Sequence, residues 1–211
     1  AVGITPMTEK GSKRLVRAAI RHALAQNLPS VTLVHKGNIM KFTEGAFRQH
    51  GYDVAKEEFS GQTVVEAEAA SAPGKLVIKD RIADAMFQEA LIRPEQYSVL
   101  ATPNLNGDYI SDALAAQVGG LGLAPGVNMS EKLAFFEATL AGKDRANPGS
   151  LILSGALMLE HIGWKEAATR IYKAVNTAIA RRAVTEDLAA QMADARTVGC
   201  TEFGEIITKL L

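Results

Sequence analysis

Three short apolar runs constrain this fold more than any other feature of the sequence. They are Val31–Val34, Leu76–Ile78 and Ser98–Thr102. Continuous apolar runs of this length are typical of strands that are buried in a parallel sheet. Because helical patterns separate the runs, the sequence predicts an α/β architecture, with a mixed sheet, flanking helices and a helical C-terminal third.

Caps and breaks predict the helices of the first part of the chain. Thr8 can cap a helix that runs to about Asn27, and Thr43 can cap a second helix that ends before Gly51. The segment Tyr52–Phe59, which follows this break, has the composition of a strand.

The stretch at residues 61–75 is small, polar and weakly patterned, so we expect a surface loop there, with a possible short strand. Asp80 stands where an N-cap belongs. The helix that it would open, from Arg81, stops before Pro94, because the residue before a proline disfavours helical backbone.

The rest of the chain is expected to be mainly helical, with one strand at residues 134–139. A helix that begins near Tyr109 ends at Gly119–Gly120, which is also the natural place to divide the chain into two parts. Further helices are predicted to start near Pro148, Trp164, Thr185 and Thr201.

Composition narrows the class of protein. Basic and acidic residues number 23 each, and this balance gives no reason to expect a nucleic-acid partner. No apolar run approaches the ~20 residues that span a bilayer, and residues 1–10 lack the apolar centre of a signal peptide. The single cysteine, Cys200, fits a reducing compartment. We therefore expect a cytoplasmic protein with no membrane partner.

The glycines at positions 119, 120 and 122 do not match a phosphate-binding loop. Such loops follow a strand and open a helix, whereas these glycines follow a helix. Ala124 and Pro125 also occupy the later positions of the dinucleotide fingerprint. A helix C-cap followed by a turn is the better interpretation.

Asp108 and Asp112 are four residues apart at a predicted helix start, so their carboxylates project from one face. Carboxylates this close repel unless solvent or a cation compensates, and Mg²⁺ and Mn²⁺ prefer such oxygens. On spacing alone, a solvated acidic helix start with Asp108 as its cap is the commoner explanation. Asp80 and Asp84 repeat the spacing, but a cap and the helix dipole are sufficient to explain them.

His35 and Lys36 directly follow the apolar run Val31–Val34. In open α/β sheets, ligands bind beyond the carboxyl ends of the strands. A lysine at that place could hold a carboxylate or act as a base, although a solvated loop lysine is the commoner case. We expect His35 to be only a loop or partly buried residue.

Four segments together resemble the prokaryotic isocitrate dehydrogenases. They are VTLVHKGNIMKFTEGAF at 31–47, NLNGDYISDALAAQVGG at 104–120, NPGS at 147–150 and CTEFGE at 200–205. The resemblance runs along nearly the whole chain. The sister dehydrogenases for isopropylmalate and homoisocitrate share the fold and the paired aspartates, but the first segment favours the isocitrate branch.

This resemblance implies an isocitrate/isopropylmalate dehydrogenase-like fold, present in part, and an active site shared by two identical subunits. Asp108 and Asp112 would bind Mg²⁺ or Mn²⁺ on one subunit, and Asp84 would reach the same metal from the partner. Lys36, also from the partner, would contact isocitrate and assist proton transfer, so Lys36 and Asp84 are the expected catalytic residues. A homodimer follows from this sharing.

The resemblance also implies a nicotinamide cofactor. The residues expected to contact the cofactor are Asn38, Gln88, Arg93, Leu140, Asn147 and Glu186. NADP-specific members grip the 2′-phosphate with tyrosine and arginine at the positions that are Leu140, Glu186 and Ala190 here. Leucine cannot donate a hydrogen bond and glutamate repels a phosphate, so we expect NAD, with NADP as the alternative.

The family's domain plan divides the chain into three parts. Residues 1–8 would end a clasp-like or linker segment, residues 9–118 would form a small α/β domain with dimer-forming helices, and residues 119–211 would form part of the large cofactor-binding domain.

The chain departs from the family in two places that bear on activity. It begins roughly where the family's second half begins, so the residues that grip the substrate carboxylates are absent, and we expect the chain alone to be incomplete for catalysis. After Thr139, about six residues of the adenosine-binding loop are missing, either by deletion or because the printed chain omits them. Homoisocitrate or isopropylmalate dehydrogenase, or a non-catalytic fragment or assembly subunit, are the alternatives.

Overall fold

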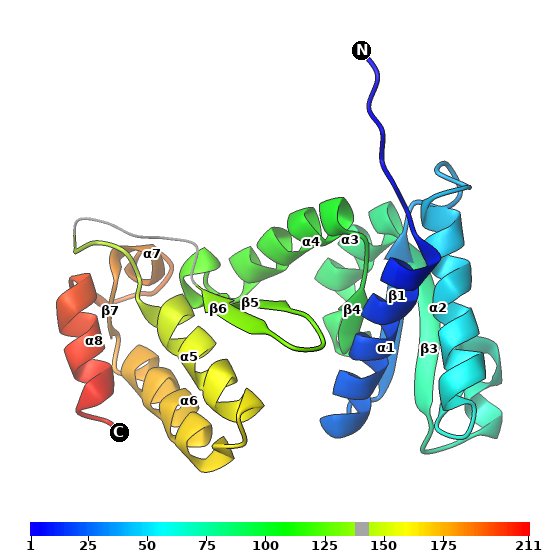
Figure 1. Ribbon diagram of the computed structural model, residues 1–211. Helices are drawn as coiled ribbons and strands as arrows, with labels where there is room; N and C mark the ends of the chain where they lie inside the picture. The colour runs from blue at the N-terminus through cyan, green and yellow to red at the C-terminus, as the bar shows by residue number, and fades with distance from the viewer. Residues whose placement is uncertain (138–143) are drawn as a thin grey trace. The chain divides into compact units, whose positions relative to one another are not determined.

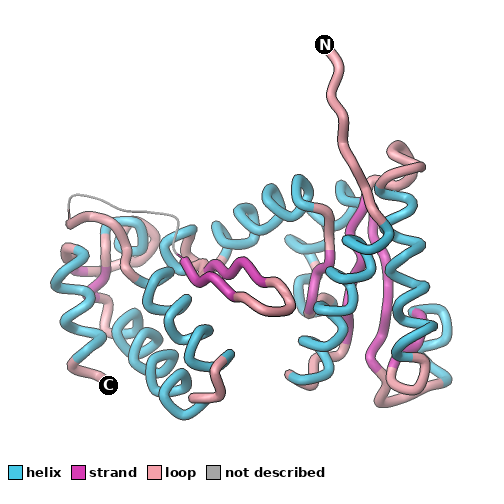
Figure 2. Tube along the Cα trace, in the orientation of Figure 1, coloured by secondary structure: helices cyan, strands magenta, loops and turns pink. Residues whose placement is uncertain are grey.

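The computed structural model describes residues 1–137 and 144–211 (Figures 1 and 2). It divides into two compact units, Ala1–Ser111 and Asp112–Leu211, and each is described by itself. Helix α4, Asn104–Gln117, carries the chain from the first unit into the second. No helix among the described residues combines the length and the apolar character needed to cross a membrane.

A four-stranded parallel sheet forms the centre of the first unit, with the strands in the order β2-β3-β1-β4. Its elements are α1 Glu9–Ala25, β1 Ser30–His35, α2 Glu44–Phe59, β2 Thr63–Val65, η1 Glu66–Ser71, β3 Leu76–Ile82, α3 Ala83–Ile92, η2 Pro94–Gln96 and β4 Val99–Ala101. The three predicted apolar runs supply β1, β3 and β4. The predicted α/β class with flanking helices is therefore confirmed, but this sheet is entirely parallel and not mixed as predicted.

The core of the first unit lies between the sheet and helices α1 and α2. Its fully buried side chains include Val16 and Ile20 on α1, Leu33 on β1, Phe47 on α2 and Ile78 on β3. The predicted cap of α1 is confirmed, because Thr8 Oγ1 accepts a hydrogen bond from the Gly11 amide at 3.1 Å.

Helix α2 corrects two sequence predictions. It continues through Phe59, so Gly51 does not end it and Tyr52–Phe59 is not a strand. The buried residues Phe47, Gly51, Val54 and Ala55 follow helical spacing, which outweighs the strand-like composition. A Cβ at Gly51 would lie 2.6 Å from Leu33 Cδ1, so this glycine allows α2 to approach β1 closely.

One predicted helix cap is wrong, and another is confirmed in position only. Strand β3 extends to Ile82, so Asp80 lies inside a strand and does not cap α3, which begins at Ala83. Thr43 precedes α2, but its side chain makes no capping hydrogen bond. Local sequence suits a cap at both places, but Asp80 pairs with Leu33 in the parallel ladder, and the ladder continues beyond it.

The second unit is mainly helical. Its elements after α4 are η3 Leu121–Leu123, β5 Gly126–Met129, β6 Ala134–Glu137, α5 Gly149–His161, α6 Lys165–Ala180, β7 Ala183–Val184, α7 Glu186–Ala189, β8 Arg196–Thr197 and α8 Cys200–Thr208. Strands β5 and β6 pair antiparallel, and β7 and β8 pair parallel. The core brings together Ala178 on α6, Val184 on β7, Leu188 on α7 and Phe203 on α8.

The glycine pair after α4 ends this helix, as predicted. Gly119 and Gly120 have φ values of +121° and +96°, which side chains with a Cβ rarely adopt. The Gly120 amide donates to the Ala115 carbonyl at 2.7 Å and so closes the last turn.

Candidate functional site

Lys36 and Asp84 meet at the carboxyl edge of the sheet in the first unit. Lys36 follows β1, and Asp84 lies in the first turn of α3, just after the adjacent parallel strand β3. Lys36 Nζ lies 2.5 Å from Asp84 Oδ1. The hydrogen bond from Lys36 lowers the pKa of the Asp84 carboxyl, and the amide of Asp84 itself contributes in the same direction. Both predicted catalytic residues therefore lie together at the edge where α/β proteins bind ligands.

The turn that carries Lys36 is held by several hydrogen bonds. The amides of Ile39 and Met40 donate to the Lys36 carbonyl at 3.0 and 2.9 Å. The Lys36 amide donates to Glu44 Oε2 at 2.5 Å. Gly37 packs against the start of α2 so closely that an added Cβ would meet backbone at 2.8 Å. The backbone of this turn is therefore fixed beneath the lysine side chain.

His35, expected to be a loop or partly buried residue, is a buried strand residue in a polar network. Its Nε2 lies 3.0 Å from Asp80 Oδ2, and its Nδ1 accepts from the Gly37 amide at 3.0 Å, which assigns the proton to Nε2. Tyr52 donates to Asp80 Oδ1 at 2.6 Å, and Arg48 Nε lies 3.1 Å from Oδ2. The bond from His35 is the main cause, with Tyr52 and Arg48 next, of an Asp80 pKa far below its usual range.

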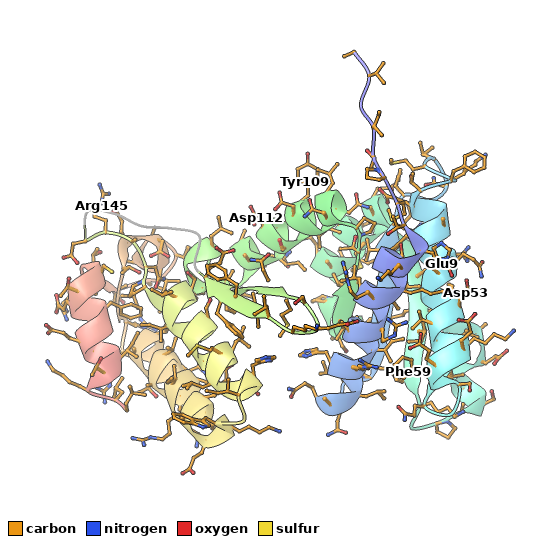
Figure 3. The ribbon with its side chains drawn as sticks, in the orientation of Figure 1. Glu9, Asp53, Phe59, Tyr109, Asp112 and Arg145 are labelled. Carbon is orange, nitrogen blue, oxygen red and sulfur yellow. The ribbon has the colours of Figure 1, made fainter. Side chains whose placement is uncertain are left out.

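Asp108 and Asp112 are exposed on α4, one helical turn apart, and Figure 3 shows Asp112 on this helix. Helix α4 starts at Asn104, so Asp108 lies inside the helix and the alternative of Asp108 as its cap is wrong. Within residues 1–137 and 144–211, neither carboxylate has a hydrogen bond or ion pair, and no three metal-ligating side chains cluster. Two oxygen donors on one face fit part of the coordination of a hard divalent cation.

A pocket of about 450 Å³ in the second unit brings together two predicted cofactor residues, Asn147 and Glu186. Asn147 is buried, donates to Asp187 at 3.0 Å and accepts from the Gly149 amide at 2.8 Å. Arg145, labelled in Figure 3, donates to Glu186 at 3.0 Å from Nε. Sequence reasoning missed Arg145 and Asp187, because their partners are about 40 residues away in the chain.

The other predicted cofactor residues do not line this pocket. Asn38, Gln88 and Arg93 are exposed side chains of the first unit, and Arg93 lies 3.8 Å from Glu89 in a long ion pair. Leu140 lies outside the described residues, as does the segment after Thr139 where the sequence predicts that part of the adenosine-binding loop is missing.

Known proteins match this chain along almost its whole length. A family model described as isocitrate/isopropylmalate dehydrogenase matches residues 1–207. A Pseudomonas aeruginosa protein named isocitrate dehydrogenase, with NADP in its name, is 52% identical over an alignment of 215 positions, which covers 97% of this chain and 51% of the relative. A protein of the same name from Archaeoglobus fulgidus is 50% identical over an alignment of 222 positions, which covers 100% of this chain and 54% of the relative.

A solved structure gives the same fold. The crystal structure of isocitrate dehydrogenase from Methylococcus capsulatus matches with a TM-score of 0.85 at 39% identity, over 98% of this chain and 57% of that chain. The chain spans about half the length of the curated relatives it matches.

Proposed function

The chain belongs to the isocitrate/isopropylmalate dehydrogenase family, and from this we propose that it forms part of a decarboxylating isocitrate dehydrogenase. The Lys36–Asp84 pair carries the proposal, because it places a cation and an anion 2.5 Å apart at the ligand-binding edge of a parallel sheet. Since the chain spans about half the length of its relatives, the activity is proposed for the whole protein.

The proposed reaction converts isocitrate to 2-oxoglutarate and CO₂. A base takes the hydroxyl proton, and the carbinol carbon gives its hydride to the nicotinamide. The resulting β-keto acid loses one carboxylate as CO₂, and the enolate that remains takes up a proton at carbon to give 2-oxoglutarate. Lys36 Nζ is proposed to bind the substrate and to move a proton at its oxygen. Substrate would replace Asp84 as the partner of this ammonium group.

We propose that the reaction uses Mg²⁺ or Mn²⁺. Asp108 and Asp112 would hold the cation together with Asp84 of a second copy, and three carboxylates leave positions for water and the substrate. When bound, the cation supplies Lewis-acid stabilisation to the substrate oxygen. A homodimer is therefore part of the proposal. The side chains that α3 exposes, Phe87, Leu91 and Ile92, support a surface for the second copy.

We also propose that the nicotinamide cofactor is NAD. The relatives carry NADP in their names, whereas Glu186 and Ala190 of this chain offer no donor to a 2′-phosphate. Arg145 lies against Glu186 in the same pocket, so it is the cation that could offset the repulsion. We expect kcat/KM to be higher with NAD than with NADP. Equal or better efficiency with NADP would refute this preference.

A Mn²⁺ titration tests the metal site. We expect Asp108→Asn and Asp112→Asn each to abolish Mn²⁺ binding, because each removes one of few carboxylate ligands. Glu131→Gln is the matched control, since it removes an exposed carboxylate elsewhere in the second unit. Mn²⁺ affinity that survives both aspartate substitutions would contradict the proposed site.

A non-catalytic assembly role is the second candidate, since the exposed apolar side chains of α3 would equally suit a purely structural interface. It predicts no Mn²⁺ affinity and no turnover by the whole protein with isocitrate, isopropylmalate or homoisocitrate. The enzyme proposal predicts turnover with isocitrate and much lower kcat/KM for the other two acids.

A further inference from the structure

Glu44 is a buried acidic residue in the first unit to which the proposed reaction gives no role. It is the first residue of α2, and 7% of it is exposed. Its Oε2 accepts hydrogen bonds from the Lys36 amide at 2.5 Å and from Asn106 Nδ2 at 2.7 Å. A single oxygen atom therefore joins two segments that are 8 and 62 residues away along the chain.

The environment of Glu44 explains how a carboxylate is tolerated there. A buried carboxylate is unfavourable unless hydrogen bonds or opposite charge compensate it. Among the described residues, no lysine, arginine or histidine forms an ion pair with Glu44. The two hydrogen bonds and the N-terminal end of the α2 dipole remain as its compensation. Both donors are consequently held where this oxygen lies.

The two segments that Glu44 joins carry residues of the two sites of the proposed dimer, because Lys36 of one copy acts with the aspartates Asp108 and Asp112 of the other copy. One is the turn whose side chain is Lys36. The other is the first turn of α4, where Asn106 lies two residues before the proposed metal ligand Asp108. A shift of Glu44 would move the lysine turn and the start of α4 relative to one another.

We infer that Glu44 is a positioning residue, which holds the Lys36 turn and the aspartate-bearing helix α4 in a fixed relation. This inference rests on the proposed function for its catalytic consequence, but the bridge itself belongs to the described residues. A buried acid that serves only packing would affect stability and leave the chemistry of the folded protein unchanged.

Substitutions at both ends of the bridge test the inference. Glu44→Ala removes the shared acceptor, whereas Glu44→Gln keeps one carbonyl oxygen that can accept both bonds. We expect E44A to lower kcat of the whole enzyme by about 10- to 100-fold with little change in KM for isocitrate, as for other residues that orient site groups. E44Q is expected to stay within about threefold of wild type. Glu57→Gln, an exposed α2 glutamate, is the control.

Asn106→Ala separates the two arms of the bridge. We expect it to weaken Mn²⁺ binding by about tenfold, while the hydrogen exchange rate of the Lys36 amide stays as in the wild type. E44A should both weaken Mn²⁺ binding and accelerate hydrogen exchange of the Lys36 amide. The double variant E44A/N106A should resemble E44A, because the effects of substitutions within one hydrogen-bond network are not additive.

The outcomes keep the two proposals distinct. If kcat and Mn²⁺ affinity of folded E44A equal those of wild type, the positioning role is overturned. If E44Q loses as much activity as E44A, charge and not the geometry of the bridge is responsible, and the inference is again overturned. If wild-type protein neither binds Mn²⁺ nor turns over isocitrate, the proposed function fails. In that case faster Lys36 amide exchange in E44A still supports the bridge, and unchanged exchange overturns it.

Discussion

The two units of this chain hold their candidate site residues in different ways. In the first unit, adjacent parallel strands place Lys36 and Asp84 at one sheet edge, and short hydrogen bonds fix the lysine turn. In the second unit, ladders of two to four residues carry little of the structure, and loop contacts such as Arg145–Glu186 shape the pocket. The comparison shows that sheet topology sets the site of the first unit, whereas side-chain pairs between loops and helix ends set the site of the second.

The difference has a physical consequence. The sheet edge rests on the hydrophobic core of its unit and cannot move unless this core is disturbed. Exposed ion pairs, in contrast, contribute little to stability and are screened by salt. Substitutions at the sheet edge should therefore strongly reduce the activity of the whole enzyme. Substitutions at the rim of the pocket in the second unit should have little effect on the stability of that unit.

The largest effect is expected at Lys36. Replacing it with methionine keeps the aliphatic chain but removes the amino group, so proton transfer loses its proposed group. We expect kcat of the whole enzyme to fall by about 10²- to 10⁴-fold. Lys56→Met, at an exposed lysine of α2, is the control and should leave kcat unchanged. A similar loss in both variants, or none in Lys36→Met, would remove Lys36 from the mechanism.

Truncation of the two core phenylalanines compares the units directly. Phe47 in the first unit and Phe203 in the second are both essentially unexposed. Each change to alanine should cost about 3–5 kcal/mol, because it removes buried apolar area and leaves a cavity. Amide hydrogen exchange of Leu33 reports on the first unit and that of Val175 on the second. We expect each variant to accelerate exchange mainly in its own unit. Equal acceleration of both amides would show that the units unfold together.

How far the sequence predicts this structure depends on the range of the interaction. Apolar runs report burial locally, so the strands of the parallel sheet could be predicted from Val31–Val34, Leu76–Ile78 and Ser98–Thr102. Lys36 could be named through the family resemblance because it stands in the segment 31–47, whereas Asp84 lies outside the four segments and could be named only because the resemblance runs along nearly the whole chain. The helical spacing of Phe47, Gly51, Val54 and Ala55 was also present in the sequence, and giving weight to composition instead produced the wrong strand.

Long-range polar partners could not be predicted in the same way. His35 and Asp80 are 45 residues apart, and they meet because β1 and β3 are neighbours in the sheet. The strand order decides this contact, and no local pattern encodes it. Glu44 is similar, since an acid in a first helical turn looks like an ordinary dipole partner until Asn106 is placed beside it.

Two neighbouring glycines offer a sharper test of the rigid lysine turn. In Gly37→Ala the new Cβ would lie 2.8 Å from Gly45 Cα, so backbone must shift, and we expect a loss of about 1–3 kcal/mol in unfolding free energy. In Gly45→Ala the nearest atom to the new Cβ lies 3.5 Å away, so there is room for it. The higher helix propensity of alanine should then raise the unfolding free energy by up to about 1 kcal/mol. Denaturant unfolding of both variants measures this. Equal stability of the two variants would mean that the turn adapts easily.

The smallest effects are expected when the pH is lowered, and the stability of the two units should respond to acid differently. Asp80 in the first unit has a pKa far below its usual range, because His35, Tyr52 and Arg48 donate to it. In the second unit, the pKa of Asp144 is lowered by hydrogen bonds from the Thr201 hydroxyl and amide, but Asp144 is fully exposed. A carboxyl with a depressed folded pKa stabilises fully above its unfolded value, about 3.9, and loses this as pH falls toward the folded pKa.

Below about pH 4 we therefore expect exchange at Leu33 to accelerate more than exchange at Val175, since the network around Asp80 is partly buried and that around Asp144 is screened by solvent. Asp80→Asn should reduce the acceleration of Leu33 amide exchange in acid. Asp144→Asn should change the acceleration of Val175 amide exchange only slightly. If Asp80→Asn keeps the full acid response of the first unit, other carboxyls cause it. The buried network would then orient the lysine turn without contributing to its stability in acid.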